Sequence, residues 1–427
     1  MPIELSDDQY RAVQKMHNGC VLCGSTGAGK SRTSLAYYYK TFGGKLYNVG
    51  DEFGSVRLRR DTRNIGILSK DDRMVNPCDL YIITTPNKRD TDDWNLEMAI
   101  FGLNTDPMLN TYYNHVFVDS WNNIKKYVDV AGAFFIFDEQ RAGGRGVWAK
   151  TFVKIARKNR WILVSATPGD KWEDYIPLFL ANNFYCNRTE FTREHFVYSR
   201  FAKYPKVTHV LNEGKLIKER NSILVNMEYK NDVSINKFNL VCDYDKKLYK
   251  QIMKSRFDPF KKEPVESASE LCYLLRKVVN THVDRIRQIN ELIQRYDRVL
   301  IFYNYDYELG ILKEKVDWPD DWVIAERNGH KHDELPRENK WAYLVQYASG
   351  AEAWNCITTN VIIFYSYSYS YRNMVQAMGR INRRNTLFKD LYYYFLTSYA
   401  PIDIGITRSL KCKKNFNEAN WLEKHNA

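Results

Sequence analysis

The chain has 427 residues, of which 44% are hydrophobic and 27% are charged, so it is long enough for two globular domains with separate cores. No apolar run is long enough to span a bilayer and no signal peptide is expected, which argues against a membrane protein and favours a cytoplasmic one. The net charge of +12 suits a polyanionic partner, although a basic balance is weak evidence by itself.

The first predicted feature is a strand that leads into a glycine-rich loop and then into a helix. The apolar run 20–23 precedes this loop, and residues 32–36 favour a helix after it. Glycines let the backbone N–H groups face phosphate oxygens, Lys30 would reach the β- and γ-phosphates, and the Ser31 hydroxyl would bind Mg²⁺. The sequence therefore predicts a nucleoside triphosphate site, the P-loop, made of Gly24, Ser25, Thr26, Gly27, Ala28, Gly29, Lys30 and Ser31.

The apolar run before the P-loop also contains Cys20 and Cys23, which have CxxC spacing. Because both cysteines lie within a predicted strand, we expect buried thiols rather than a metal or redox site.

An acidic pair follows the apolar run 134–137, which predicts a buried strand. Open α/β sheets bind ligands at the carboxyl ends of their parallel strands. Asp138 would hold the Mg²⁺ of the nucleotide, directly or through water, and Glu139 would orient or deprotonate the attacking water. A solvated turn after a core strand is the alternative, and the P-loop upstream favours the catalytic interpretation.

Four motifs occur in a fixed order along the chain: the P-loop, Asp138–Arg141, Ser165–Pro168 and Gln376–Arg384. This order resembles that of superfamily 2 helicases and translocases, and in finer detail the Swi/Snf-type branch and the small stand-alone helicases of bacteriophages. The resemblance extends from about Leu5 to Arg384 and includes weaker motifs at 5–9, 82–86, 116–120, 298–304 and 346–355. Two departures are Arg141 at the end of the DExx motif and Ala353 where relatives often carry glycine.

The resemblance also implies roles for residues outside the P-loop. Gln9 would read the adenine, and Gln376 would also contact the nucleotide. Arg380 and Arg383, which are three residues apart on one predicted helix, would act as arginine fingers on the γ-phosphoryl group. The implied coupling residues are Ser165 and Thr167, and the implied contacts with a nucleic-acid backbone are Thr85, Pro86, Asn304 and Gly350.

The alternation of strands and helices predicts an α/β fold with mostly parallel sheets, and the resemblance implies two tandem RecA-like domains with an ATP cleft between them. Strands are expected near Cys20, Tyr81, Phe117, Phe134 and Trp161, and then at 299–302, 322–324, 343–345 and 361–364. The expected boundaries are 1–182 for the first domain, 183–240 for a connector or insertion, 241–405 for the second domain and 406–427 for a polar tail.

Two further stretches each allow two interpretations. The basic run Arg57, Arg59, Arg60 and Arg63 could contact nucleic acid or form a solvated loop. Tyrosines 365, 367, 369 and 371 alternate with serine, so a strand would place them on one face. They could stack on bases or pack beside the helix that follows, and packing is favoured.

We therefore expect an ATP-dependent DNA helicase or translocase that uses ATP and Mg²⁺ and acts in phage-type DNA replication or recombination. An RNA-directed ATPase and a nucleotide-gated DNA-binding or loading protein without unwinding activity are the alternatives. The expected partner is nucleic acid, with DNA favoured over RNA, and replication or loading proteins are possible further partners. We expect a monomer that binds no membrane and lies in the cytoplasm, which is the host cytoplasm if the chain is phage-encoded.

Overall fold

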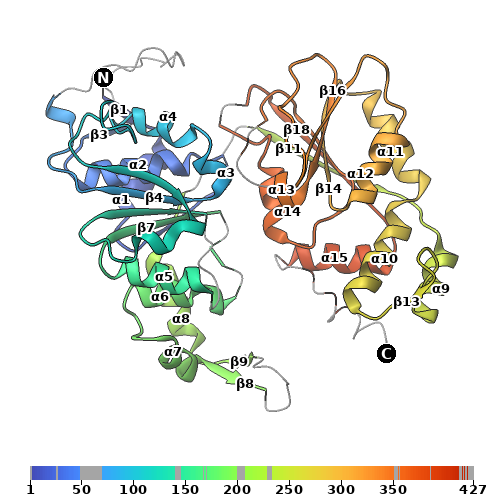
Figure 1. Ribbon diagram of the computed structural model, residues 1–427, viewed down its shortest axis with the longest axis horizontal. Helices are drawn as coiled ribbons and strands as arrows, with labels where there is room; N and C mark the ends of the chain where they lie inside the picture. Colours follow the sequence, from blue (N-terminus) through green and yellow to red (C-terminus); the bar gives the residue numbers. More distant parts are fainter. Residues whose placement is uncertain are drawn as a thin grey trace. The chain divides into compact units, whose positions relative to one another are not determined.

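The computed structural model describes residues 2–25, 27–48, 70–139, 146–166, 168–169, 171–199, 207–227, 233–350, 354, 356–384, 386–412, 416, 418 and 421. The chain forms two compact units, Met1–Lys230 (unit 1) and Asn231–Ala427 (unit 2) (Figure 1).

Unit 1 is built on a parallel sheet of six strands in the order β10-β2-β7-β6-β4-β5. The strands are β2 (Val21–Cys23), β4 (Leu80–Thr84), β5 (Val116–Ser120), β6 (Phe134–Asp138), β7 (Arg160–Ser165) and β10 (Leu224–Asn226). All five strands expected from the sequence are confirmed, and β10 is an addition. The central strands are nearly continuous apolar runs because helices cover both faces of the sheet.

Two helical layers cover this sheet, as Figure 1 shows. Helices α1 (Asp7–Lys15), α2 (Lys30–Thr41) and α4 (Asp93–Ala99) pack on one face, against Leu22, Ile82 and Ile136. Helices α5 (Val147–Ala156), α6 (Trp172–Ala181), α7 (Arg188–His195) and α8 (Glu213–Ile223) pack on the other, against Val21, Ile83 and Phe137. The smaller elements are β1 (Ile3–Leu5), β3 (Leu46–Asn48), η1 (Lys70–Asp72), α3 (Pro86–Arg89), η2 (Trp121–Tyr127), β8 (Phe196–Tyr198) and β9 (Val207–Val210).

Unit 2 repeats this plan with the parallel strand order β11-β18-β17-β14-β16-β15. The strands are β11 (Ser234–Val241), β14 (Arg298–Tyr303), β15 (Val323–Arg327), β16 (Trp341–Gln346), β17 (Val361–Phe364) and β18 (Asp390–Thr397). Helices α9 (Lys246–Ser255), α10 (Ala268–Asn280), α14 (Tyr371–Met378) and α15 (Pro401–Lys411) cover one face, and α11 (Val283–Ile293) and α12 (Asp306–Glu314) cover the other. The remaining elements are α13 (Tyr347–Gly350) and the pair β12 (Phe257–Asp258) and β13 (Glu263–Pro264).

The two sheets and their helices confirm the expected fold class, two tandem RecA-like α/β domains. The segment 183–240, expected as a connector or insertion, is divided between the units. Strand β10 pairs with β2 of unit 1, whereas β11 pairs with β18 of unit 2. Residues 406–411 of the expected polar tail belong to α15, where Ile406 is buried.

The alternating tyrosines do not lie on one face, because β17 ends at Phe364 before they begin. Tyr365 packs in the layer that contains α11, and Tyr367 packs in the opposite layer with α10 and α14. Tyr369 is half-buried against Phe416. The stretch is not a strand, so the condition for a common face is not met. Packing beside the following helix, α14, is confirmed for Tyr367, whereas Tyr365 is buried in the opposite layer.

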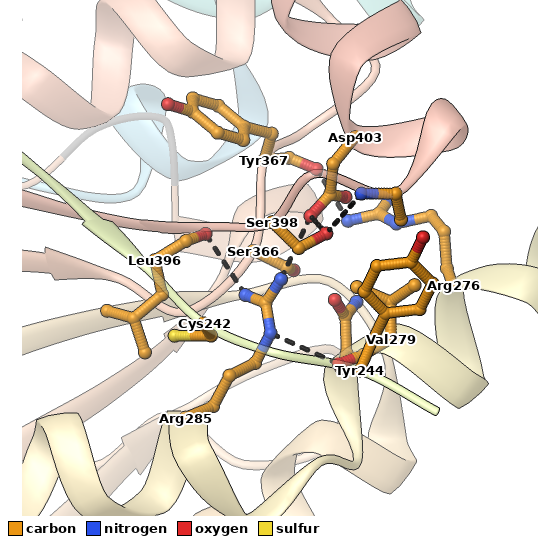
Figure 2. Close-up of polar contacts among 12 residues, drawn as sticks. Cys242, Tyr244, Arg276, Val279, Arg285, Ser366, Tyr367, Leu396, Ser398 and Asp403 are labelled. Carbon is orange, nitrogen blue, oxygen red and sulfur yellow. Dashed lines mark hydrogen bonds and ion pairs between the residues drawn. The ribbon is translucent and has the colours of Figure 1, made fainter. Parts of the chain in front are cut away.

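A buried ion pair connects α11 to α15 inside unit 2 (Figure 2). Arg285 Nη2 lies 3.0 Å from Asp403 Oδ2, and neither side chain is more than 4% exposed. Arg285 also donates to the carbonyl oxygens of Val279 and Leu396, and Ser398 Oγ donates to Asp403 Oδ2 over 2.7 Å. These bonds tie the helices α10, α11 and α15 to β18, and they leave neither charge alone in the core.

We expect Asp403→Asn to destabilise unit 2 by about 3–5 kcal/mol, because it leaves the Arg285 charge buried without its partner. Hydrogen exchange of peptides from β18 and α15, measured on the whole chain, reports this loss directly. Asp320→Asn, at an exposed carboxylate of the same unit, is the matched control. Equal protection in both variants would contradict the prediction.

Candidate nucleotide site

The carboxyl ends of four parallel strands bring most of the predicted site of unit 1 to one edge of its sheet. Cys23 pairs with Ser165, Asp138 pairs with Val164, and Ile83 pairs with Phe137. The chain segments that follow β2, β7, β6 and β4 therefore leave the sheet side by side. The P-loop, Asp138–Glu139, Ser165 and the Thr85 turn lie on these segments, at the edge where such sheets bind ligands.

The P-loop adopts the backbone that its glycines permit. Gly27 and Gly29 have φ values of 84° and 85°, a left-handed conformation that favours glycine. Helix α2 begins at Lys30, so its first N–H groups face the loop. The Lys30 ammonium donates to the carbonyl oxygens of Gly24 (3.0 Å) and Ser25 (2.8 Å). Thr26 lies outside the described residues.

Gln9 links the start of α1 to the P-loop. Its Oε1 accepts bonds from the Ser6 N–H (3.2 Å) and hydroxyl (3.0 Å), and its Nε2 donates to the Gly29 carbonyl (3.3 Å). This capping box fixes the side chain, which is 5% exposed, against the loop. The role of Gln9 in reading adenine stays a prediction.

Asp138 is a buried carboxylate that a lysine neutralises. Its Oδ2 accepts bonds from the Thr84 hydroxyl (2.9 Å) and from Lys88 Nζ (2.6 Å), and its side chain is 3% exposed. The same ammonium also donates to Ser31 Oγ over 3.4 Å. Burial opposes the charge on Lys88, but Asp138 raises the pKa of its ammonium above the ordinary value, so Lys88 is protonated at neutral pH.

The sequence did not predict a role for Lys88, because its contact depends on which strands are neighbours. Lys88 lies four residues after Thr84, the last residue of β4, and β4 is the sheet neighbour of β6. A cation in the turn after the neighbouring strand can reach a carboxylate at the end of β6. Only the strand order, which the sequence did not give, makes this contact foreseeable.

The residues around Asp138 fit a magnesium ion. Ser31 Oγ and Asp138 Oδ2 already converge on one cation, the Lys88 ammonium. Mg²⁺ commonly uses one or two carboxylates and takes its other ligands from phosphate and water. Within the described part of the chain, no three His, Cys, Asp or Glu side chains gather as a metal cluster. A magnesium ion held by Ser31 and Asp138 would take its other ligands from nucleotide phosphate and water.

Glu139 has a strained backbone. Its φ is 58°, in the left-handed region that a residue with a side chain rarely adopts. The Glu139 N–H donates to the Val164 carbonyl over 2.9 Å, which holds the turn to β7. Strain of this kind concentrates at functional positions, so the geometry supports a role for Glu139 beyond that of a solvated turn.

The candidate arginines of unit 2 do not share a helix. Helix α14 ends at Met378 and Gly379 is its C-cap, so Arg380 and Arg383 lie beyond the helix and the expected common face is wrong. Arg380 is 3% exposed, donates to the Trp354 carbonyl and lies over the Trp354 ring. Arg383 is half-buried, and Gln376 is buried on α14. Arg380 thus fixes the chain around Trp354 within its own unit.

The predicted nucleic-acid contacts differ in their exposure. Pro86 is exposed at the start of α3, after the buried N-cap Thr85. The Asn304 amide donates to Ser366 Oγ (2.8 Å) and to the Tyr367 carbonyl (3.0 Å), so it is engaged inside unit 2. Gly350 is the last residue of α13. Thr167, Arg141, Ala353 and the basic run at 57–63 lie outside the described residues.

Cys20 and Cys23 are free, buried thiols, as expected. Burial raises the pKa of each to about 12, so neither is a reactive thiolate at neutral pH.

The chain matches no protein-family model and no curated protein. Among solved structures, it is similar to the SWI2/SNF2 ATPase core of Sulfolobus solfataricus in complex with double-stranded DNA. The two chains are 13% identical, the TM-score is 0.37, and the match covers 95% of this chain and 88% of the other. This similarity is too low to support a fold assignment, which rests on the strand order instead. No helix within the described ranges is long and apolar enough to cross a bilayer.

We expect Glu139→Gly to relieve strain and stabilise the ligand-free protein by up to about 1 kcal/mol, because glycine adopts a positive φ freely. The same change should abolish ATP turnover if Glu139 acts on water. Glu139→Gln keeps the strain and should lose turnover without gaining stability. Thermal unfolding and nucleotide binding of both variants separate the two effects. Turnover retained in Glu139→Gln would rule out the proposed role.

Proposed function

We propose that this chain is an ATP-dependent DNA helicase or translocase. The observation that supports this most is the convergence of the P-loop, Asp138 and the strained Glu139 at the carboxyl edge of one parallel sheet. A phosphate-binding loop, a buried carboxylate and a second carboxylate beside it are the parts that ATP hydrolysis requires.

Each residue then has a defined task in hydrolysis. Lys30 exchanges its bonds to the Gly24 and Ser25 carbonyls for bonds to the β- and γ-phosphates. Ser31 and Asp138 would hold Mg²⁺, which neutralises charge on the phosphates when it is bound. Glu139 orients or deprotonates the attacking water, which is a task for a carboxylate near the γ-phosphate.

Unit 2 supplies the remaining charge in this proposal. Arg383, and Arg380 if it leaves Trp354, would act on the γ-phosphoryl group. ATP would then favour one arrangement of the two units and hydrolysis another. Alternating grip on a nucleic-acid backbone, by the turn at Thr85 through its exposed Pro86 on one unit and by residues around Gly350 on the other, would give directional stepping.

DNA is the proposed substrate because the motif at 376–383 has the form QxxGRxxR, and the net charge of +12 suits a polyanion. A role in phage-type replication or recombination follows from the resemblance to small phage helicases, and Mg²⁺·ATP is the proposed cofactor.

The decisive experiment measures ATP turnover side by side with single-stranded DNA, duplex DNA and RNA. We expect stimulation by DNA, and a strand-displacement assay then separates unwinding from translocation. Stimulation by RNA alone would favour an RNA-directed ATPase, and turnover that no nucleic acid changes would favour a nucleotide-gated binding protein.

We expect Lys30→Ala to abolish ATP turnover in a protein that still folds, because Lys30 carries the P-loop's full positive charge and the glycines set the loop's shape. Circular dichroism checks folding and a phosphate-release assay measures turnover. Turnover like that of the unsubstituted chain would refute the nucleotide assignment.

Arg383→Ala should lower the turnover rate by about 10³-fold or more while ATP affinity changes little, because an arginine finger acts on charge that develops in the transition state. Basal turnover without nucleic acid is the measurement that discriminates. If only the DNA-stimulated part is lost, Arg383 contacts nucleic acid or links the units instead. Arg384→Ala, the neighbouring half-buried arginine, is the control.

A further inference from the structure

Lys88 is a charged side chain placed between the two groups expected to bind Mg²⁺. Strand β4 ends at Thr84, Thr85 is the N-cap of α3, and Pro86 is its first residue, which favours the start of a helix. The Lys88 N–H bonds the Thr85 carbonyl over 3.1 Å, so the turn is closed. This short helix brings Lys88 beside the end of β6.

The contacts of Lys88 are those of a cation bound in a site. Its ammonium lies 2.6 Å from Asp138 Oδ2 and 3.4 Å from Ser31 Oγ, and its charge lies 5.2 Å from the centre of the Trp94 ring. The Lys88 side chain is 22% exposed, whereas Asp138 is 3% exposed. Lys88 is therefore the member of the pair with a path toward solvent.

A metal ion and this ammonium compete for the same oxygens. A buried carboxylate needs a cation close by, because an unpaired charge in the protein interior is costly. Mg²⁺ bound to Asp138 and Ser31 would lie within a few ångströms of the ammonium, where two positive charges repel each other. Because the two cations would repel each other, Mg²⁺ bound at Asp138 would favour displacement of the ammonium.

We propose that Lys88 is a displaceable internal cation that occupies the Asp138–Ser31 site until Mg²⁺·nucleotide replaces it. This inference rests on the proposed function, because it takes Asp138 and Ser31 as the groups that hold the metal. Without a ligand, Lys88 keeps the site formed and balances the negative charge of Asp138. It also lowers the affinity of the site for Mg²⁺, because the ammonium and the metal compete. It is a positioning residue with a measurable effect on metal binding.

The test compares Lys88→Met with the unsubstituted chain in ADP binding, measured by calorimetry with EDTA and again with saturating Mg²⁺. The variant should gain about tenfold in ADP affinity with Mg²⁺, as expected when a competitor that fills the site for most of the time is removed. Its affinity for ADP in EDTA should not change. Arg89→Met is the matched control, since Arg89 is the next residue of α3 but pairs with Asp90 and Asp119.

Thermal unfolding provides a second readout that involves no turnover. Lys88→Met should unfold at a lower temperature than the unsubstituted chain in EDTA, because Asp138 loses its cation. The difference in unfolding temperature between Lys88→Met and the unsubstituted chain should disappear with Mg²⁺·ADP, because the metal then neutralises Asp138. Ligand binding and stability are linked, so the two readouts must agree. Lys88→Arg should behave like the unsubstituted chain, and Lys88→Gln tests the charge if Lys88→Met does not fold.

Two results would overturn the inference. Weaker ADP binding in both EDTA and Mg²⁺ would make Lys88 a nucleotide ligand, and an equal loss of stability with and without Mg²⁺·ADP would make it only structural. If the unsubstituted chain binds no ADP under either condition, the proposed function fails as well. If it binds ADP with Mg²⁺ and the variant shows the same dependence on Mg²⁺, the inference alone fails.

Discussion

The candidate site depends on one buried carboxylate, Asp138. A parallel sheet covered on both faces has its strand ends as the accessible edge, and Asp138 is the last residue of a fully buried strand there. A charge in this position destabilises the fold unless it is paired and hydrogen-bonded. Thr84 and Lys88 meet this requirement from the neighbouring strand and the helix after it. The need to neutralise Asp138 therefore ties the P-loop, through Ser31, to the segment that carries Thr85 and Pro86.

Unit 2 also contains charged side chains deep in its core, and these too must be paired or hydrogen-bonded. The segment that joins β17 to α14 presents the Tyr365 and Tyr367 carbonyls and the Ser366 hydroxyl to buried charged groups. Their hydrogen-bond partners are Arg285, Arg276 and Glu308, none of which is more than 1% exposed. This segment leads directly into α14, which carries Gln376. Buried charged groups thus fix the segment that leads into α14, the helix that carries Gln376.

The sequence predicted most of the buried strands, but it did not predict β10, β11 and β18 or the contacts that depend on strand order. Long apolar runs such as 134–137 and 361–364 are strands, because burial on both faces leaves no polar alternation. Strand β11 was missed because it lies at the edge of its sheet and its residues are half-buried or exposed, and β10 has only three residues. The end of α14 was misplaced because helical spacing alone does not show where a helix stops. The contact of Lys88 was not predicted because its partner, Asp138, lies 50 positions away in the chain.

Both cations of the candidate site are held by oxygen atoms of the protein. Lys30 bonds the Gly24 and Ser25 carbonyls, and Lys88 bonds Asp138 and Ser31. In the proposed function, Mg²⁺·nucleotide would replace these protein oxygens as the partners of Lys30 and Lys88. The glycines hold the loop open while Lys30 changes partners, since their left-handed backbone does not depend on that side chain. If the site binds nucleotide as proposed, its affinity would depend on how readily the two lysines give up the contacts that they make without ligand.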